Sequence, residues 1–255
     1  MQNLPNPLLG DVWAITIATP DLDLSFEFYQ KLGFSELWRS DFPFPCMQIT
    51  DGALLMMLRK DNNPYIALTY YVKDHETVAK KVEEQGISFA MKPQKTDPVQ
   101  RYLFNSPDGL NISLVGFMEG FVQPPGATLL TMPQQDFFNP EKYSNKTCGM
   151  FGEFCHPVAD LDRSIEFWGK IGFKVLSQFK TTYPWAILSD GMSIIGLHQT
   201  KEFSYPAITY FAADMKEKIE NLKGSGMKVH KEKGPSNIEL LSPEQQHIFL
   251  FKLGM

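Results

Sequence analysis

The chain has 255 residues, of which 43% are hydrophobic and 21% charged, with a formal net charge of −5. This composition predicts a packed soluble protein of one large domain or two ordinary ones, and it excludes general disorder. Lysine and arginine form no cluster, so we expect neither nucleic acid nor an anionic membrane surface as a partner. No segment approaches the length of a membrane span, and the three cysteines lack disulfide or zinc spacing, which favours a reduced, cytoplasmic protein.

The first predicted element is a strand at 12–18, in which large and small side chains alternate, so we expect it to be covered on one face only. An amphipathic helix follows at 21–34, with Asp21 as its N-cap and Gly33 at its end. Three further strands are predicted near 34–39, 45–50 and 53–59. These elements form one βαβββ unit.

A second unit begins with a strand at 65–72 and a helix at 74–86. Its three remaining strands are predicted near 88–92, 100–105 and 110–116. The turn Ser106-Pro107-Asp108-Gly109 precedes the last of them.

The same order of elements then repeats. Residues 21–34 (DLDLSFEFYQKLGF) and 160–173 (DLDRSIEFWGKIGF) are identical at nine of 14 positions. Other segments of the two halves match in the same order, which predicts four βαβββ units. We place the halves at 8–118 and 147–254, joined by a proline-containing connector at 119–146. Whether the units pair within or across the halves stays open.

The repeated Asp-Leu-Asp-x-Ser-x-x-Phe-Tyr/Trp motif, the following Gly-Phe, the Asp-Gly turn and the Ser-Pro turn resemble the vicinal oxygen chelate superfamily. Its members include glyoxalase I, bleomycin-resistance proteins and extradiol dioxygenases. The resemblance implies an α+β fold of two tandem glyoxalase-like domains, whose curled mixed sheets enclose cavities. Fold does not determine the reaction, which depends on the residues of the site.

Metal-dependent members of this superfamily hold a divalent ion with four inward side chains, usually His, Gln or Glu. The resemblance places the corresponding positions at Ala14, Met56, Ala67 and Ser113 in the first half and at Glu153, Ile195, Ala207 and Phe249 in the second. Only Glu153 is a plausible metal ligand among them. We therefore expect no bound metal and no other cofactor.

Glu153 is the candidate catalytic residue, because strand alternation directs it away from Phe154 and into the expected cavity. It would serve there as a proton acceptor or as an anchor for a ligand. The alternatives are a carboxylate at a solvated strand start or a structural ion pair with Arg101 or a lysine. Cys155 shares the Glu153 face but lacks a Cys-His-Asp arrangement, and His198 is expected to face solvent.

The remaining candidate residues lie at inward positions of the predicted strands, and His247 is expected at a cavity rim. The predicted ligand-binding residues are Gln48, Met56, Thr69, Tyr71, Arg101, Asn111, Ser113, Cys155, Thr209, His247 and Phe249. A mostly apolar wall with a few polar groups is typical of a small-molecule site.

The preferred hypothesis is a metal-free monomeric protein that binds a small, partly apolar or aromatic molecule. The alternative is a glyoxalase-type lyase, isomerase or dioxygenase that uses Glu153 as acid or base. A third possibility is a structural module whose cavities have closed.

Overall fold

A computed structural model describes residues 6–116 and 126–254. The elements of the first half are β1 (Val12–Thr19), α1 (Leu22–Lys31), β2 (Ser35–Ser40), β3 (Cys46–Thr50), β4 (Leu55–Lys60), β5 (Ile66–Val72), α2 (His75–Glu84), β6 (Arg101–Asn105) and β7 (Asn111–Gly116). Two short 3₁₀ helices follow at Gln134–Asp136 and Pro140–Lys142. The elements of the second half are β8 (Met150–Pro157), α3 (Leu161–Lys170), β9 (Lys174–Phe179), β10 (Trp185–Ser189), β11 (Ile194–His198), β12 (Ala207–Ala212), α4 (Met215–Gly224), β13 (Lys231–Gly234), β14 (Asn237–Leu241) and β15 (His247–Lys252).

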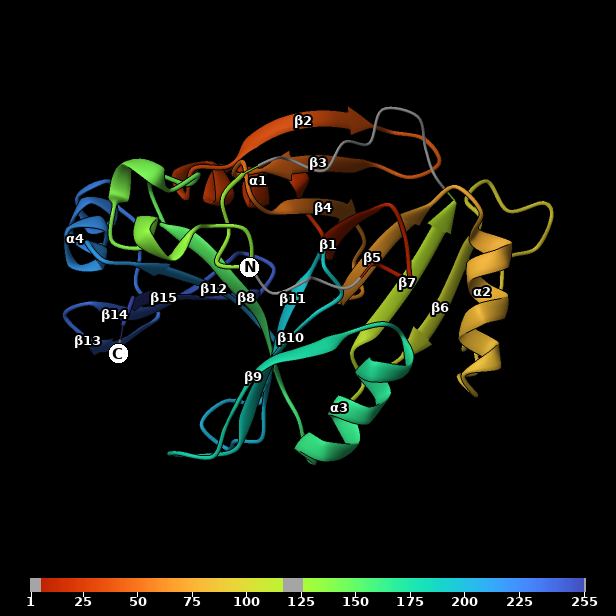
Figure 1. Ribbon diagram of the computed structural model, residues 1–255. Helices are drawn as coiled ribbons and strands as arrows, with labels where there is room; N and C mark the ends of the chain where they lie inside the picture. The colour runs from red at the N-terminus through yellow and green to blue at the C-terminus, as the bar shows by residue number, and fades with distance from the viewer. Residues whose placement is uncertain (1–5, 117–125, 255) are drawn as a thin grey trace. The chain divides into compact units, whose positions relative to one another are not determined.

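Each half of the sequence forms one open mixed sheet, which confirms the α+β class and the tandem repeat. The strand order is β2-β3-β4-β1-β5-β7-β6 in the first sheet and β13-β14-β15-β12-β8-β11-β10-β9 in the second. Figure 1 shows α2 beside β7 in the first half and α4 beside β14 and β15 in the second. No helix within the described residues is long and apolar enough to cross a membrane.

The repeated helices begin and end as their sequences predict. Asp21 accepts a hydrogen bond from the backbone N–H of Leu24 at 3.0 Å, and Asp160 accepts one from Arg163 at 3.1 Å. Gly33, after α1, has a φ of 91°, a conformation that favours glycine over any residue with a Cβ. The helix boundaries are therefore encoded locally.

Two expectations about strands are wrong. The strand expected near 88–92 is reduced to a single bridge between Met91 and Leu103, because Pro93 follows closely and has no N–H to continue a ladder. Strand β1 is buried along its whole length rather than on one face, since it lies between β4 and β5 in the middle of its sheet. Its alternation is one of side-chain size, not of exposure.

The chain also divides into two compact units that do not follow the two halves. Unit 1 contains β5, α2, β6 and β7 together with α3 and β9–β11, and unit 2 contains α1 and β2–β4 together with β12, α4 and β13–β15. The division falls inside β1 and β8. Each compact unit thus combines one βαβββ repeat from the first half of the sequence with one from the second half. The predicted boundary between residues 118 and 119 lies outside the described residues, and the domain limits 8–118 and 147–254 stay a prediction.

Hydrogen bonds inside each unit join the two halves at equivalent places. In unit 2, Asp51 of the first Asp-Gly turn accepts a hydrogen bond from the Tyr210 hydroxyl, and Glu244 accepts one from Ser25 at 2.7 Å. In unit 1, Tyr70 is hydrogen-bonded to Ser193 at 2.8 Å, beside the second Asp-Gly turn. Asp108 likewise accepts a hydrogen bond from Ser164 on α3. Within a compact unit, βαβββ units therefore contact each other across the halves.

Candidate functional site

A fully buried carboxylate of unit 2 belongs to Glu239 on β14, whose side chain is 0% exposed. Its Oε1 accepts a hydrogen bond from the Tyr205 hydroxyl at 2.6 Å and lies 2.6 Å from Nδ1 of His247. Its Oε2 is buried and makes no hydrogen bond within the described part of the chain. Half of a buried carboxylate is thus left without a donor.

Strand register explains why these side chains meet. Thr209 on β12 lies opposite Phe249 on β15, and Phe249 lies opposite Glu239 on β14. Paired residues of neighbouring strands project from the same face of a sheet. His247 is two residues before Phe249 and therefore projects from this face too. The intervening residues, such as Ile248 and Leu250, are buried on the other face.

The electrostatics keep Glu239 ionised. Burial on its own would raise the pKa of Glu239, but hydrogen bonds from Tyr205 and His247 outweigh it, and the pKa lies below the usual value. Burial lowers the pKa of His247 despite the nearby carboxylate. His247 is therefore neutral near pH 7, and the contact with Glu239 requires that its Nδ1 carry the proton and donate it.

Aromatic rings and one ammonium border the carboxylate. The rings of Tyr205 and His247 are stacked with centroids 3.3 Å apart, and those of Phe249 and Phe251 with centroids 5.2 Å apart. The Nζ of Lys233 lies 4.7 Å from the Phe249 ring centroid, in cation–π geometry. We call the set Tyr205, Thr209, Lys233, Glu239, His247 and Phe249 the Glu239 site.

The structure brings together three predicted residues in this site, namely Thr209, His247 and Phe249. The sequence reasoning missed Glu239 and Tyr205. A signal for Glu239 was present, because it stands between the apolar residues Ile238 and Leu240 of the strand. A charged residue at an alternate position of a buried strand needs a partner or a function.

In the first half, the β3–β4 hairpin separates two residues that were predicted to line one cavity. Gln48 lies opposite Met57, whereas Met56 lies opposite Ile49. Gln48 and Met56 therefore project from opposite faces of the sheet, and their predicted common face is wrong. The face of Gln48 also carries Cys46 and Arg59, which pair with each other.

The remaining predicted residues of the first half lie in unit 1. Thr69 and Ser113 are paired, Tyr71 pairs with Val115, and Arg101 pairs with Val115 from the other side. The Thr69 hydroxyl is hydrogen-bonded to Thr16 at 2.7 Å, and Asn111 donates to the Ile66 carbonyl at 3.1 Å. Thr69, Tyr71, Arg101, Asn111 and Ser113 thus share one face of the sheet, and their role in binding stays a prediction.

His198 is not solvent-facing, as the sequence suggested, but 8% exposed. Its ring is stacked on Trp185 with centroids 5.6 Å apart, and Tyr183 is hydrogen-bonded to its Nδ1 at 3.2 Å. A ring nitrogen of His198 and the thiol of Cys155 lie within 4.8 Å of each other. Aromatic packing around the end of β11 therefore buries His198, contrary to the expectation from the sequence. Cys155 also has a histidine neighbour that the sequence did not reveal.

Glu153 lies two residues before Cys155 on β8 and is 6% exposed. The alternative of a solvated strand start is therefore wrong. An inward functional carboxylate and a structural ion pair both stay open for Glu153.

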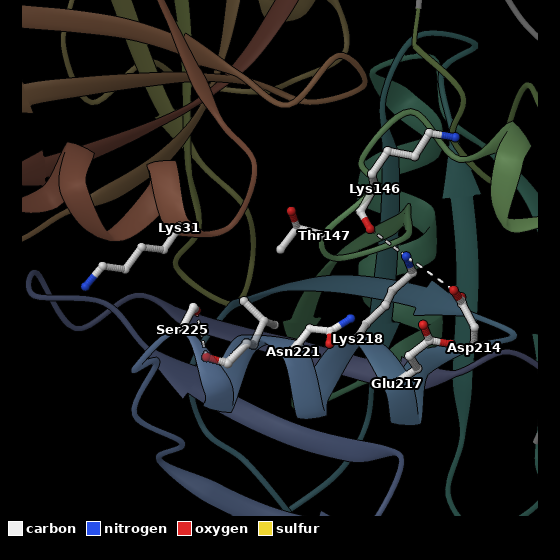
Figure 2. A pocket seen from close by; sticks show the side chains of 9 residues that line it. Lys31, Lys146, Thr147, Asp214, Glu217, Lys218, Asn221 and Ser225 are labelled. Carbon is white, nitrogen blue, oxygen red and sulfur yellow. Dashed lines mark hydrogen bonds and ion pairs between the residues drawn. The ribbon is translucent and has the colours of Figure 1, made fainter.

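A pocket of about 400 Å³ lies in unit 2 near α4 (Figure 2). Its lining residues are Lys31, Lys146, Thr147, Asp214, Glu217, Lys218, Asn221, Leu222 and Ser225. The buried ammonium of Lys218 donates to the Lys146 carbonyl at 2.6 Å and lies 3.4 Å from Asp214, as Figure 2 shows. The Lys218 charge is thus already paired with Asp214 through Oδ2, whereas the buried Oδ1 of Asp214 has no hydrogen-bond partner among the described residues.

Residues 13–114 match the model of the Glyoxalase/Bleomycin resistance protein/Dioxygenase superfamily. The match covers most of the first half of the chain, and over these residues the sequence is similar to that superfamily. No curated protein matches the chain in sequence.

Solved structures show the fold over nearly the whole chain. The 2,3-dioxygenase LapB from Pseudomonas sp. KL28 is 14% identical, with a TM-score of 0.62, over 98% of this chain and 94% of that one. Homoprotocatechuate 2,3-dioxygenase from Arthrobacter globiformis is 15% identical, with a TM-score of 0.61, over 98% and 81%. A variant of the Brevibacterium fuscum enzyme is 13% identical, with a TM-score of 0.59, over 97% and 72%. At these identities the likeness concerns the fold alone.

Apart from Glu153, the side chains at the superfamily's metal positions do not fit a metal ion. Those of the first half are Ala14, Met56, Ala67 and Ser113, all buried, and only Ser113 has an oxygen. In the second half, Ile195, Ala207 and Phe249 are buried and offer no donor atom. Divalent cations need several oxygen, nitrogen or thiolate ligands that converge on one point. No chemical step is therefore derived through a metal at these positions.

Proposed function

We propose that the protein binds a small, partly aromatic molecule at the Glu239 site. The proposal depends on one observation, the buried Oε2 of Glu239 that has no hydrogen-bond partner among the described residues. Leaving a buried charged acceptor unsatisfied costs several kcal/mol, about as much as a protein recovers when a ligand donor fills that position. The site is thus suited to a ligand with an N–H or O–H group.

The surroundings of the carboxylate define the ligand further. Phe249 and the stacked Tyr205–His247 pair offer apolar ring surface beside Glu239. Tyr205 and His247 both hydrogen-bond to Oε1 of Glu239. These bonds fix the orientation of the carboxylate and therefore the position of Oε2. An aromatic amine or phenol combines the ring and the donor that this arrangement can bind. We propose that the protein acts as a binding protein of the bleomycin-resistance type and that it is a monomer.

Glu239→Gln tests the proposal, because it keeps the shape and removes the charge. Binding of benzylamine or catechol, measured by calorimetric titration, should weaken by about 10- to 100-fold, the value of one charge-assisted hydrogen bond. The melting temperature should fall slightly, since Tyr205 and His247 stabilise the carboxylate in the folded protein more than burial destabilises it, and an amide oxygen accepts their hydrogen bonds more weakly.

Glu232→Gln is the matched control, because Glu232 is an exposed glutamate on the neighbouring strand β13. It should leave the affinity of the probe unchanged. Equal binding by wild type and Glu239→Gln, or equal losses in both variants, would contradict a site at Glu239.

We further propose that binding is metal-free. Elemental analysis of untagged, dialysed protein should find far less than one equivalent of Fe, Mn, Ni or Zn per chain, because Glu153 is the one plausible metal ligand among the eight superfamily positions. About one equivalent of metal would contradict this. Cys155→Ala would then show whether the thiol near His198 is involved, since cysteine and histidine are ligands for zinc.

An enzyme is the second candidate, and the proximity of Cys155 and His198 is the observation that favours it. Glu153 would serve as acid or base, in a lyase, isomerase or dioxygenase of the glyoxalase type. The similar solved structures are 2,3-dioxygenases, but that activity would require metal ligands that the superfamily positions here do not supply. Oxygen uptake with a catechol, lost in Glu153→Gln, would support the enzyme over the binding protein.

A further inference from the structure

A second face in unit 2, on the β3–β4 hairpin of the first half, carries unmet donors instead of an unmet acceptor. Gln48 on β3 lies opposite Met57 on β4, and Cys46 lies opposite Arg59 in the next pair along. Gln48 and Arg59 are therefore diagonal neighbours on one face, at a spacing that long side chains can bridge. We call Phe44, Cys46, Gln48, Met57 and Arg59 the Arg59 face.

Two N–H groups on this face have no hydrogen-bond partner among the described residues. These are Nε2 of Gln48, a residue that is 3% exposed, and Nε of Arg59. Buried donors in folded proteins are nearly always bonded, so each unpaired donor indicates a missing acceptor. Both are donors, and only an acceptor can satisfy them together.

The guanidinium of Arg59 is held in place by aromatic rings, but no carboxylate among the described residues pairs with its charge. Its Cζ lies 3.8 Å from the centroid of the Phe44 ring, and the Tyr65 ring lies 6.0 Å away. Within the described residues, no carboxylate lies within ion-pair distance of Arg59, and Arg59 and Asp41 act in opposite directions on the pKa of Cys46. Stacking on Phe44 fixes the plane of the guanidinium and leaves its edge free to bond an anion.

We propose that the Arg59 face binds the carboxylate of a small aromatic acid. An arginine edge matches a planar carboxylate through two parallel N–H···O bonds, and the Gln48 amide supplies a further neutral donor. Phe44 and the buried Met57 provide apolar surface for the ring of the ligand. One positive charge and one amide suit a monoanion better than a dianion, because burying a second negative charge without a partner is costly.

This site differs from the Glu239 site in chemistry and in sequence position, and it does not depend on the proposed function. The Glu239 site offers a carboxylate and would bind a ligand with an N–H or O–H donor. The Arg59 face offers N–H donors and would bind a ligand with an anionic group. If no ligand binds at one site, the proposal for the other site still stands. The Glu239→Gln variant should accordingly bind an aromatic carboxylate as well as wild type does.

Calorimetric titration of the full-length protein with benzoate tests the proposal. Arg59→Gln should weaken benzoate binding by about 10- to 100-fold, and Arg59→Lys should weaken it too, since lysine keeps the charge but loses the planar fork. Gln48→Met should weaken it by a smaller factor, because a neutral donor is lost. Lys60→Gln is the matched control, since it removes the same charge from the adjacent, exposed residue and should leave the affinity within about twofold.

Three outcomes would overturn the proposal. One is a wild-type protein that shows no saturable binding of benzoate at millimolar concentration. Another is an Arg59→Gln variant with wild-type affinity, or a Lys60→Gln variant with the same loss. The third is inorganic phosphate that displaces benzoate and binds more tightly, which would assign the face to phosphate. If Arg59→Gln fails to fold, Arg59→Lys and Gln48→Met decide the question, with circular dichroism to check their folding.

Discussion

At the scale of single residues, His156 on β8 shows how much a buried polar group depends on its surroundings. Both of its ring nitrogens are buried without a hydrogen-bond partner among the described residues. Burial lowers the pKa of His156 from 6.5 to about 4, with Asp108 acting in the opposite direction and His198 in the same one. The ring is therefore neutral at pH 7 and resists protonation as long as the fold is intact.

This histidine should make the protein sensitive to acid. In the unfolded chain His156 takes up a proton near pH 6.5, whereas in the folded chain it does so only near pH 4, so stability is present above pH 6.5 and is lost as the pH falls toward 4. At about 1.4 kcal/mol per pKa unit, the loss approaches about 3 kcal/mol. Urea unfolding of wild type and His156→Phe over this pH range should show the loss in wild type only.

His75→Gln is the control for that experiment, because His75 is a half-buried histidine on α2. It should keep the acid sensitivity of wild type. A His156→Phe variant that loses stability as steeply as wild type would show that other groups bind the protons.

At the scale of elements, the features with local causes were predictable from the sequence. The caps at Asp21 and Asp160 and the glycines after both helices need only a few neighbouring residues, and they are observed where expected. The repeat adds a second, independent copy of each signal. That duplication is why the order of elements in the second half followed from the first.

Features that depend on how two secondary-structure elements pair with each other were harder to predict from the sequence. Alternation shows which residues of one strand share a face, but only the hairpin register links the faces of two strands. The closing pair Thr50–Leu55 places Gln48 opposite Met57, which separates Gln48 from Met56. Glu239 and Tyr205 are 34 residues apart and meet through a hydrogen bond that no local pattern encodes.

At the scale of the whole molecule, the duplicated sequence produces duplicated contacts between its halves. Tyr210 and Tyr70 occupy matching positions on β12 and β5. Tyr210 donates to Asp51 in the first half, and Tyr70 is hydrogen-bonded to Ser193 in the second. Each half therefore supplies a tyrosine to the Asp-Gly turn region of the other. This answers, within each compact unit, the question of pairing that the sequence left open.

The two tyrosines should differ in their effect on stability, because Tyr210 donates directly to a carboxylate, whereas Tyr70 is hydrogen-bonded to the Ser193 hydroxyl, which itself donates to Asp190. Tyr210→Phe leaves the buried Asp51 carboxylate with Asn145 as its remaining side-chain donor, at 3.0 Å, and should cost about 1–3 kcal/mol. Tyr70→Phe removes a bond between two hydroxyls and should cost about 0.5–1.5 kcal/mol. Because the Tyr210 contact joins residues of both halves within unit 2, its loss should lower the stability of that unit. Calorimetry of the two variants measures both effects, and equal losses would contradict a larger contribution of the Tyr210–Asp51 contact.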